Sequence, residues 1–198
     1  METWEIKGHI LEYIEDTHTY ICDGAILPSI TQIIKYKFKN KYSNVSESVL
    51  AKAAEKGTEV HKAIENYEKY KIEDVNCVEL RNYKFLKRQY CFDCLNNEVP
   101  IILFIDQKPF AAGRLDLELS KDNLYGLGDI KRTATLDKDY LAYQLNLYRI
   151  GFQQCYDIEI SFLYGLHLRE NVRKCVNIPI NEKVALDLIY EYIKASSY

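Results

Sequence analysis

Two acidic residues and a lysine on neighbouring predicted strands are the side chains of this sequence best placed to do chemistry. Side chains alternate between the two faces of a strand. Asp116 and Glu118 therefore project from one face of the first strand, and the other face carries three leucines, Leu115, Leu117 and Leu119. On the second strand, beyond a turn at 121–123, the same alternation places Asp129 beside Lys131.

If these strands are hairpin partners, Asp116 and Asp129 lie close enough to share a divalent cation, which prefers carboxylates, carbonyls and water as ligands. The cation relieves the repulsion between the two carboxylates, and Lys131 could hold or deprotonate a water aimed at a phosphate. Such a site would have the groups needed for metal-dependent phosphodiester cleavage, although the spacing alone does not establish it. The alternative is a hairpin that exposes Asp and Lys on a solvated face, because the Asp-Ile-Lys triplet by itself is common.

The first third of the chain must position these strands. Residues 9–27 predict a β-hairpin with turns at 15–18 and 23–24, and Ser29 is a candidate N-cap for a short helix through Ile30, Ile33 and Ile34. Residues 46–70 have the period of a long helix with His61 facing inward. The other residues of that inner stripe are Leu50, Ala53, Ala54, Gly57, Val60 and Ile64. A second helix is predicted by Leu80, Tyr83, Leu86, Tyr90 and Cys94.

The rest of the chain predicts a sheet with two further helices. Val99–Asp106, Phe110–Leu119 and Leu124–Arg132 form a β-meander. Asp137 caps a helix that carries Gln144 and Tyr148. A half-buried strand at Ile158–Leu168 and another at Val172–Ile180 follow, and Asn181 caps a closing amphipathic helix.

Composition restricts the class of protein. A chain of 198 residues with 47% apolar residues is expected to form one α/β domain, residues 1–198. No secretion signal or membrane span is expected, so we predict a soluble, cytoplasmic protein with reduced thiols. The six cysteines are too dispersed for a disulfide scaffold. A net charge of −3 argues against indiscriminate polyanion binding. It does not exclude a local band of positive side chains, which is all that a nuclease needs to bind DNA.

The ordered set of motifs resembles the PD-(D/E)XK nuclease superfamily, in particular the branch of RecB-like nuclease domains, phage exonucleases and the mitochondrial genome-maintenance exonuclease. The resemblance covers most of the chain. It is carried by Leu-Pro-Ser-Ile-Thr-Gln-Ile-Ile at 27–34, Gly-Thr-Glu-Val-His at 57–61, Ala-Gly-Arg-Leu-Asp at 112–116, Gly-Asp-Ile-Lys-Arg-Thr at 128–133 and Tyr-Gln-Leu-Asn-Leu-Tyr at 143–148.

The resemblance implies a restriction-endonuclease-like core, a central mixed sheet flanked by helices, and Mg²⁺ or Mn²⁺ as cofactor. It implies that the cation is bound by His61, Asp116, Asp129 and the backbone carbonyl of Ile130. It further implies that Lys131 acts on the attacking water and that Gln144 and Tyr148 position the substrate. Glu65 and Glu98 are second-tier candidates, the first one turn beyond His61 and the second near a further acid of some relatives.

Other polar motifs have competing interpretations. The stretch of alternating cations and aromatic rings, with Lys35, Lys37, Phe38, Lys39 and Lys41, suits phosphate contacts and base stacking, or is an ordinary solvated loop. Arg132 and Thr133 are further candidate DNA contacts. Cys91 and Cys94 have half the spacing of a zinc site but no second pair, and both fall within the predicted second helix. No iron–sulfur cluster is expected, because the cysteine group found in some RecB-like relatives is missing.

The resemblance implies a DNA exonuclease of phage or bacterial recombination, repair or processing, acting on single strands or duplex ends, with a helicase or recombination protein as a possible partner. A structure-selective or restriction-type endonuclease uses the same chemistry and is the alternative enzyme. A nucleic-acid-binding protein that has lost catalysis on the same fold is the alternative from another class.

Overall fold

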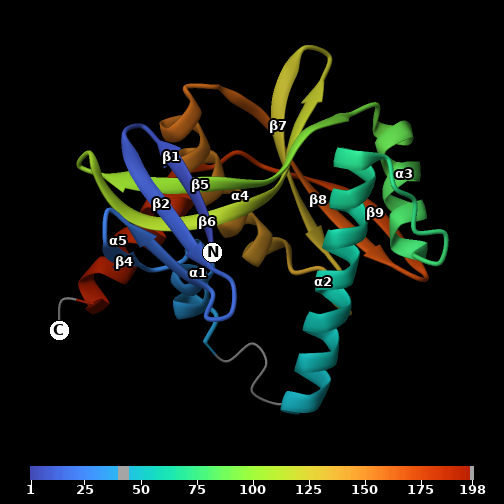
Figure 1. The fold of residues 1–198 in the computed structure, drawn as a ribbon, viewed down its shortest axis with the longest axis horizontal. Coiled ribbons are helices and arrows are strands. Elements are labelled where there is room, and N and C mark those ends of the chain that lie inside the picture. The colour runs from blue at the N-terminus through green and yellow to red at the C-terminus, as the bar shows by residue number, and fades with distance from the viewer. Residues whose placement is uncertain (40–44, 197–198) are drawn as a thin grey trace.

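The computed structural model describes residues 1–39 and 45–196, which form two β-sheets with helices packed on both faces of the larger sheet (Figure 1). The predicted α/β class is confirmed. Within the described residues, none of the helices has the length and apolar character needed to cross a membrane.

The N-terminal sheet is antiparallel and has four strands, β1 (Glu2–Ile6), β2 (His9–Ile14), β3 (Thr19–Cys22) and β4 (Ala25–Leu27). The predicted hairpin over residues 9–27 is present as β2 to β4. The sequence did not reveal β1, because only Ile6 is buried on that strand and one buried residue gives no period. The Asp23-Gly24 turn joins β3 to β4, as predicted.

The central sheet has the order β5-β6-β7-β8-β9, with bounds β5 (Asp93–Ile105), β6 (Lys108–Lys121), β7 (Leu124–Lys131), β8 (Ile160–Arg169) and β9 (Val172–Ile178). Neighbouring strands are antiparallel except β7 and β8, which are parallel. A parallel pair needs a long crossover connection, and helix α4 (Lys138–Tyr156) lies within it. The predicted meander and mixed sheet are confirmed.

The remaining helices are α1 (Ile30–Lys37), α2 (Glu47–Tyr70), α3 (Val78–Tyr90) and α5 (Glu182–Ser196). The predicted caps are present. Ser29 and Gln32 form a capping box at α1, and the Asp137 carboxylate accepts a hydrogen bond from Tyr140 N at the start of α4. Asn181 Oδ1 accepts one from Val184 N at the start of α5. These local bonds satisfy N–H groups that a helix leaves free in its first turn.

Two apolar cores lie on opposite faces of the central sheet. The larger core joins one face to the N-terminal sheet, α1, α4 and α5, and the smaller core joins the other face to α2 and α3. Leu115 belongs to the larger core, whereas Leu117 and Leu119 belong to the smaller one. The prediction that these three leucines share one face is therefore wrong, because the core that they join changes between Leu115 and Leu117.

The structure corrects three further predictions. Strand β8 is buried from Leu163 to Leu168 rather than half-buried, because helices cover both of its faces. Helix α3 ends at Tyr90, so Cys91 follows it with φ 51° and Cys94 lies on β5. The inner stripe of α2 is buried only at Val60 and Ile64, and the first three turns of that helix project away from both cores (Figure 1).

Candidate active site

The central sheet opens between β6 and β7 where the predicted acids lie. Pairing of β6 with β7 ends at Leu117 and Gly128, whereas β7 stays paired with β8 as far as Lys131. Just beyond the last β6–β7 pair, Ile130 N–H donates to Asp116 Oδ2 at 2.7 Å instead of to a backbone carbonyl of β6. The Asp116 carboxylate therefore takes the place of a backbone acceptor on β6, and a polar pocket lies where the two strands diverge.

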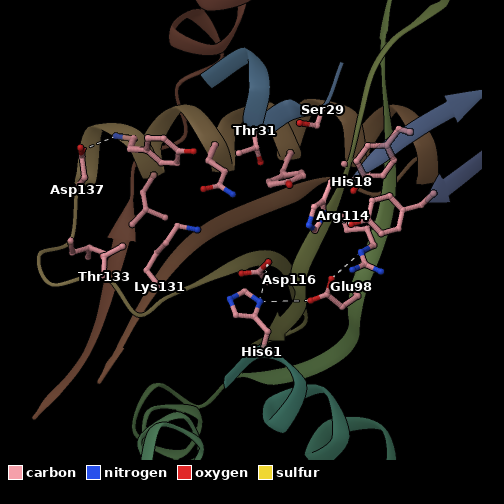
Figure 2. Close-up of a pocket in the computed structure, with 18 residues that line it drawn as sticks. His18, Ser29, Thr31, His61, Glu98, Arg114, Asp116, Lys131, Thr133 and Asp137 are labelled. Atoms are coloured by element: carbon pink, nitrogen blue, oxygen red, sulfur yellow. Dashed lines mark hydrogen bonds and ion pairs between the residues drawn. The ribbon is translucent and has the colours of Figure 1, made fainter. Parts of the chain in front are cut away.

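Three potential ligands from three elements meet at this opening: His61 of α2, Glu98 of β5 and Asp116 of β6 (Figure 2). His61 Nδ1 lies 3.7 Å from Glu98 Oε1 and 3.7 Å from Asp116 Oδ1. On the other side of the ring, Nε2 lies 3.3 Å from the carbonyl oxygen of Ile130. A carbonyl only accepts, so Nε2 carries a hydrogen, and Nδ1 faces the two carboxylates, where it holds a proton when the imidazole is charged or offers its lone pair to a cation.

This donor set fits a divalent cation. Carboxylates suit Mg²⁺ and Mn²⁺, and the imidazole favours the softer ion of the two. Burial opposes a charge on His61, but the Asp116 and Glu98 carboxylates outweigh burial and raise the pKa of its imidazole to about 9. In the metal-free protein a proton thus supplies the positive charge that these carboxylates favour, and a cation would displace it. The Ile130 carbonyl contacts the other side of the ring, where it orients the imidazole.

Asp129 and Lys131 form a buried ion pair on β7, with Asp129 Oδ2 2.5 Å from Lys131 Nζ and the Asp129 side chain only 2% exposed. The alternative of a solvated hairpin face is thereby excluded. Burial raises the pKa of the Asp129 carboxyl, against the attraction of Lys131. Burial disfavours the Lys131 ammonium, but Asp129 and Asp116 outweigh it and raise its pKa. Lys131 is therefore charged at neutral pH, which suits holding a water or phosphate rather than removing a proton.

Helix α4 supplies the opposite wall of the pocket, which has a volume of about 420 Å³ and is lined by Gln144 and Tyr148 together with His61, Asp116 and Lys131. Tyr148 packs against β6 at Gly113, where a Cβ would lie 2.9 Å from the Tyr148 ring. Gln144 is buried, and its Oε1 accepts no hydrogen bond from the residues that the structure describes. An unsatisfied buried acceptor is costly, so this oxygen is suited to a donor from a bound ligand or water.

Some predicted site residues lie outside this arrangement. Glu65 pairs with Lys62 at 3.0 Å and with Lys69 at 2.7 Å on its own helix, so binding a cation would require these ion pairs to break. Arg132 is held between Glu79 and Glu170, each at 2.7 Å. Its predicted DNA contact would need these ion pairs to break.

Thr133 lines the pocket, and its hydroxyl donates to the Thr135 carbonyl. Asp129 lies outside the three-residue group of His61, Glu98 and Asp116, whose ligand atoms are within 4.8 Å of one another.

The basic aromatic stretch is only partly available to a ligand. Lys35 is exposed, but Lys37 pairs with Glu191 at 3.0 Å, and Lys39 lies over the Tyr36 ring at 4.3 Å. The Phe38 ring packs against Tyr140 and Tyr143, so stacking of bases on Phe38 is not supported. Lys41 lies outside the described residues.

The structure raises one second-tier candidate, Glu98, and adds residues that the sequence did not single out. Glu98 moves from the second tier into the ligand group, and its backbone has φ 51° in the middle of β5, a strained conformation for a residue other than glycine. Arg114 lies 3.1 Å from Glu98. The period of two could have revealed Arg114, since it lies two residues before Asp116, but nothing indicated that the N-terminal sheet would supply Tyr13, His18 and Tyr20 to the pocket.

Comparison with known proteins adds little to this description. No family model matches the chain, and no curated protein matches it. Among solved structures, the crystal structure of SSO0001 is similar with a TM-score of 0.45 and 14% sequence identity, over 85% of this chain and 75% of that chain. We therefore infer function from the residues of this chain alone.

Proposed function

We propose that this protein is a restriction-endonuclease-like deoxyribonuclease that hydrolyses phosphodiester bonds with Mg²⁺ or Mn²⁺, and that it acts as an exonuclease. One observation carries the proposal. The ligand group of His61, Glu98 and Asp116 and the ammonium of Lys131 line the same polar pocket, at the point where β6 and β7 diverge. Cation ligands beside a fixed ammonium suit hydrolysis of an anionic ester better than binding alone.

The protein's own groups have distinct tasks in this reaction. A divalent cation held by His61, Glu98 and Asp116 would supply Lewis-acid stabilisation of the phosphoryl charge. Lys131, fixed by Asp129, orients the attacking water and offsets the negative charge that builds on the phosphate oxygens. Gln144 offers its unsatisfied Oε1 as a hydrogen-bond acceptor to the substrate or a water. Tyr148 closes the wall of the pocket behind these groups.

The experiment compares three DNA substrates, end-labelled linear duplex, circular single strands and closed circular duplex, each incubated with Mn²⁺ and with chelator. Metal-dependent loss of linear DNA alone supports the exonuclease. Cutting of circles instead identifies an endonuclease with the same site chemistry. Binding of DNA without cleavage under any metal condition would overturn the proposed activity and favour the catalytically inactive binding protein.

A further inference from the structure

Arg114 lies beside the candidate ligand group and contacts both sheets. It is on β6, two residues before Asp116, and its side chain is only 23% exposed. Its Nη1 donates to Glu2 Oε1 of β1 at 2.8 Å, and its guanidinium lies 4.7 Å from the centre of the Tyr13 ring of β2. The N-terminal sheet thus holds the guanidinium in place independently of its contact with the ligand group.

The remaining edge of the guanidinium contacts Glu98. Arg114 Nε lies 3.1 Å from Glu98 Oε2, whereas Glu98 Oε1 lies 3.7 Å from His61 Nδ1 (Figure 2). The two oxygens of this carboxylate are therefore divided between two tasks. One is held by the arginine, and the other is presented to the ligand group.

Glu98 needs such a restraint more than the other two ligands do. Asp116 is fixed by its bond from Ile130 N–H, and the His61 ring by the Ile130 carbonyl. The Glu98 side chain has more rotatable bonds than aspartate, and ordering a glutamate costs up to about 2 kcal/mol of rotamer entropy. Within the described residues, Arg114 is the group that holds Oε2 of Glu98 in place.

We propose that Arg114 is a positioning residue, which orients Glu98 as a metal ligand and thereby makes the N-terminal sheet part of the active site. This inference rests on the proposed function, because it requires that a cation binds at His61, Glu98 and Asp116. Partners of this kind, one bond away from a ligand, typically change metal affinity 10- to 100-fold when they are removed.

Charge and orientation predict opposite results, which makes the test decisive. If the guanidinium acted only through its positive charge, Arg114→Met would remove repulsion from the cation and strengthen Mn²⁺ binding, and Arg114→Lys would change little. If it orients Glu98, both variants weaken binding. Lysine has one ammonium instead of a planar fork, so it cannot hold Glu2 and Glu98 on two edges at once.

The measurement is Mn²⁺ affinity, from the electron paramagnetic resonance signal of the free ion, for the wild-type chain and for Arg114→Lys, Arg114→Met, Glu98→Gln and the double variant Glu98→Gln/Arg114→Lys. The control is Arg149→Lys, since Arg149 is comparably buried, pairs with Glu182 at 3.5 Å and lies outside the pocket. Thermal unfolding without metal verifies that each variant is folded.

We expect Arg114→Lys to weaken Mn²⁺ binding about 10-fold or more, with no further loss when it is added to Glu98→Gln and with no effect of Arg149→Lys. The positioning role is overturned if both Arg114 variants bind Mn²⁺ as tightly as the wild-type chain or more tightly. It is also overturned if Arg114→Lys weakens binding equally in the wild-type chain and in Glu98→Gln. Either result leaves the proposed function intact. Failure of the wild-type chain to bind Mn²⁺ overturns the proposed function and this inference with it.

Discussion

Two groups of potential metal ligands in the described residues have similar spacing but different surroundings. His61, Glu98 and Asp116 form one, and His9, Cys22 and Asp23 form the other. In the first group the imidazole and the carboxylates are 3.7 Å apart, which leaves their facing atoms unbonded to each other. In the second, His9 Nδ1 and Asp23 Oδ2 are already hydrogen-bonded at 2.6 Å.

The second group is also satisfied at its other atoms. Asp23 Oδ1 accepts a hydrogen bond from Ile10 N at 2.8 Å, and burial, with help from Asp23, raises the pKa of the Cys22 thiol. A cation would have to displace these bonds and a proton from sulfur. Ligand types at suitable distances are therefore insufficient evidence of a site. What distinguishes the candidate active site is that its imidazole and carboxylates are farther apart than a hydrogen bond and line a pocket that also holds the unsatisfied Oε1 of Gln144.

The largest expected difference between the two groups is in cleavage. Asp116→Asn removes a ligand charge and should abolish Mn²⁺-dependent DNA cleavage. The matched change Asp23→Asn should leave the cleavage rate within a factor of about two, because the His9–Asp23 pair is half-exposed and surface ion pairs contribute little to stability. Cleavage of end-labelled DNA by both purified variants is the measurement. Equal loss of activity in both would mean that the two groups of ligands do not differ in their role in cleavage.

The next effect concerns Lys131. Lys131→Met should lower the single-turnover cleavage rate about 100-fold, equivalent to ~2.7 kcal/mol of barrier, with a much smaller change in DNA affinity measured in Ca²⁺. It should also destabilise the fold by about 1–3 kcal/mol, because Asp129 is left buried without its counter-charge.

A double variant separates these two effects of Lys131. Lys131→Met/Asp129→Asn removes the buried charge and should recover stability in urea unfolding without recovering cleavage. Recovery of cleavage in the double variant would show that the ammonium serves only the fold and has no part in the reaction.

The sequence predicted those parts of the site that depend on strand period and helix period. Lys131 and Gln144 line the pocket because alternation on β7 and the apolar stripe of α4 fix the directions of their side chains, whereas Asp116 reaches it at the point where the predicted alternation on β6 fails. The caps at Ser29 and Asp137 were equally predictable, because a capping bond spans only three residues. Local rules therefore sufficed for most elements and their caps, but not for every facing direction, as the leucines of β6 and the burial of β8 show.

Nonlocal geometry explains what the sequence could not predict. Glu98 enters the ligand group through a left-handed backbone in mid-strand, which no residue pattern announces for a glutamate. Glu65 has the helical spacing to share a face with His61, yet two lysines on its own helix hold its carboxylate. The burial of Asp129 depends on β8 and α4, which follow it in the chain. Such outcomes are decided by packing between distant segments.

Metal affinity should distinguish the two histidines. His61→Gln is expected to weaken Mn²⁺ binding by about 100-fold or more, because loss of a ligand should exceed the 10- to 100-fold loss typical of a residue that only holds a ligand, while His9→Gln leaves binding unchanged. Calorimetric titration of both variants is the measurement. Weaker binding in His9→Gln would mean that the cation prefers the group on the N-terminal sheet.

The same histidine gives a pH dependence in the metal-free protein. Because the pKa of His61 is raised from 6.5 to about 9, its protonation stabilises the fold fully below pH 6.5, and this contribution is lost as the pH rises through 9. His61→Gln should flatten that decline in urea unfolding measured between pH 6 and pH 10. An identical pH profile in the variant would remove the assigned coupling between the imidazole and the two carboxylates.

The smallest effect tests backbone strain, which both groups contain. Glu98 has φ 51° in mid-strand, and Asp23 has φ 50° in a two-residue Asp-Gly turn, where this conformation is favourable. Glu98→Gly should be more stable than Glu98→Ala by about 1 kcal/mol, since both lack the carboxylate and only glycine relieves the strain. Asp23→Gly should likewise be more stable than Asp23→Ala by about 1 kcal/mol, because alanine meets the same penalty at this φ, and both variants lose the bond to Ile10 N–H. Urea unfolding of the four variants without metal gives these differences. If Glu98→Gly is no more stable than Glu98→Ala, the backbone at Glu98 is not strained. Glu98 would then join the ligand group at no cost in folding free energy.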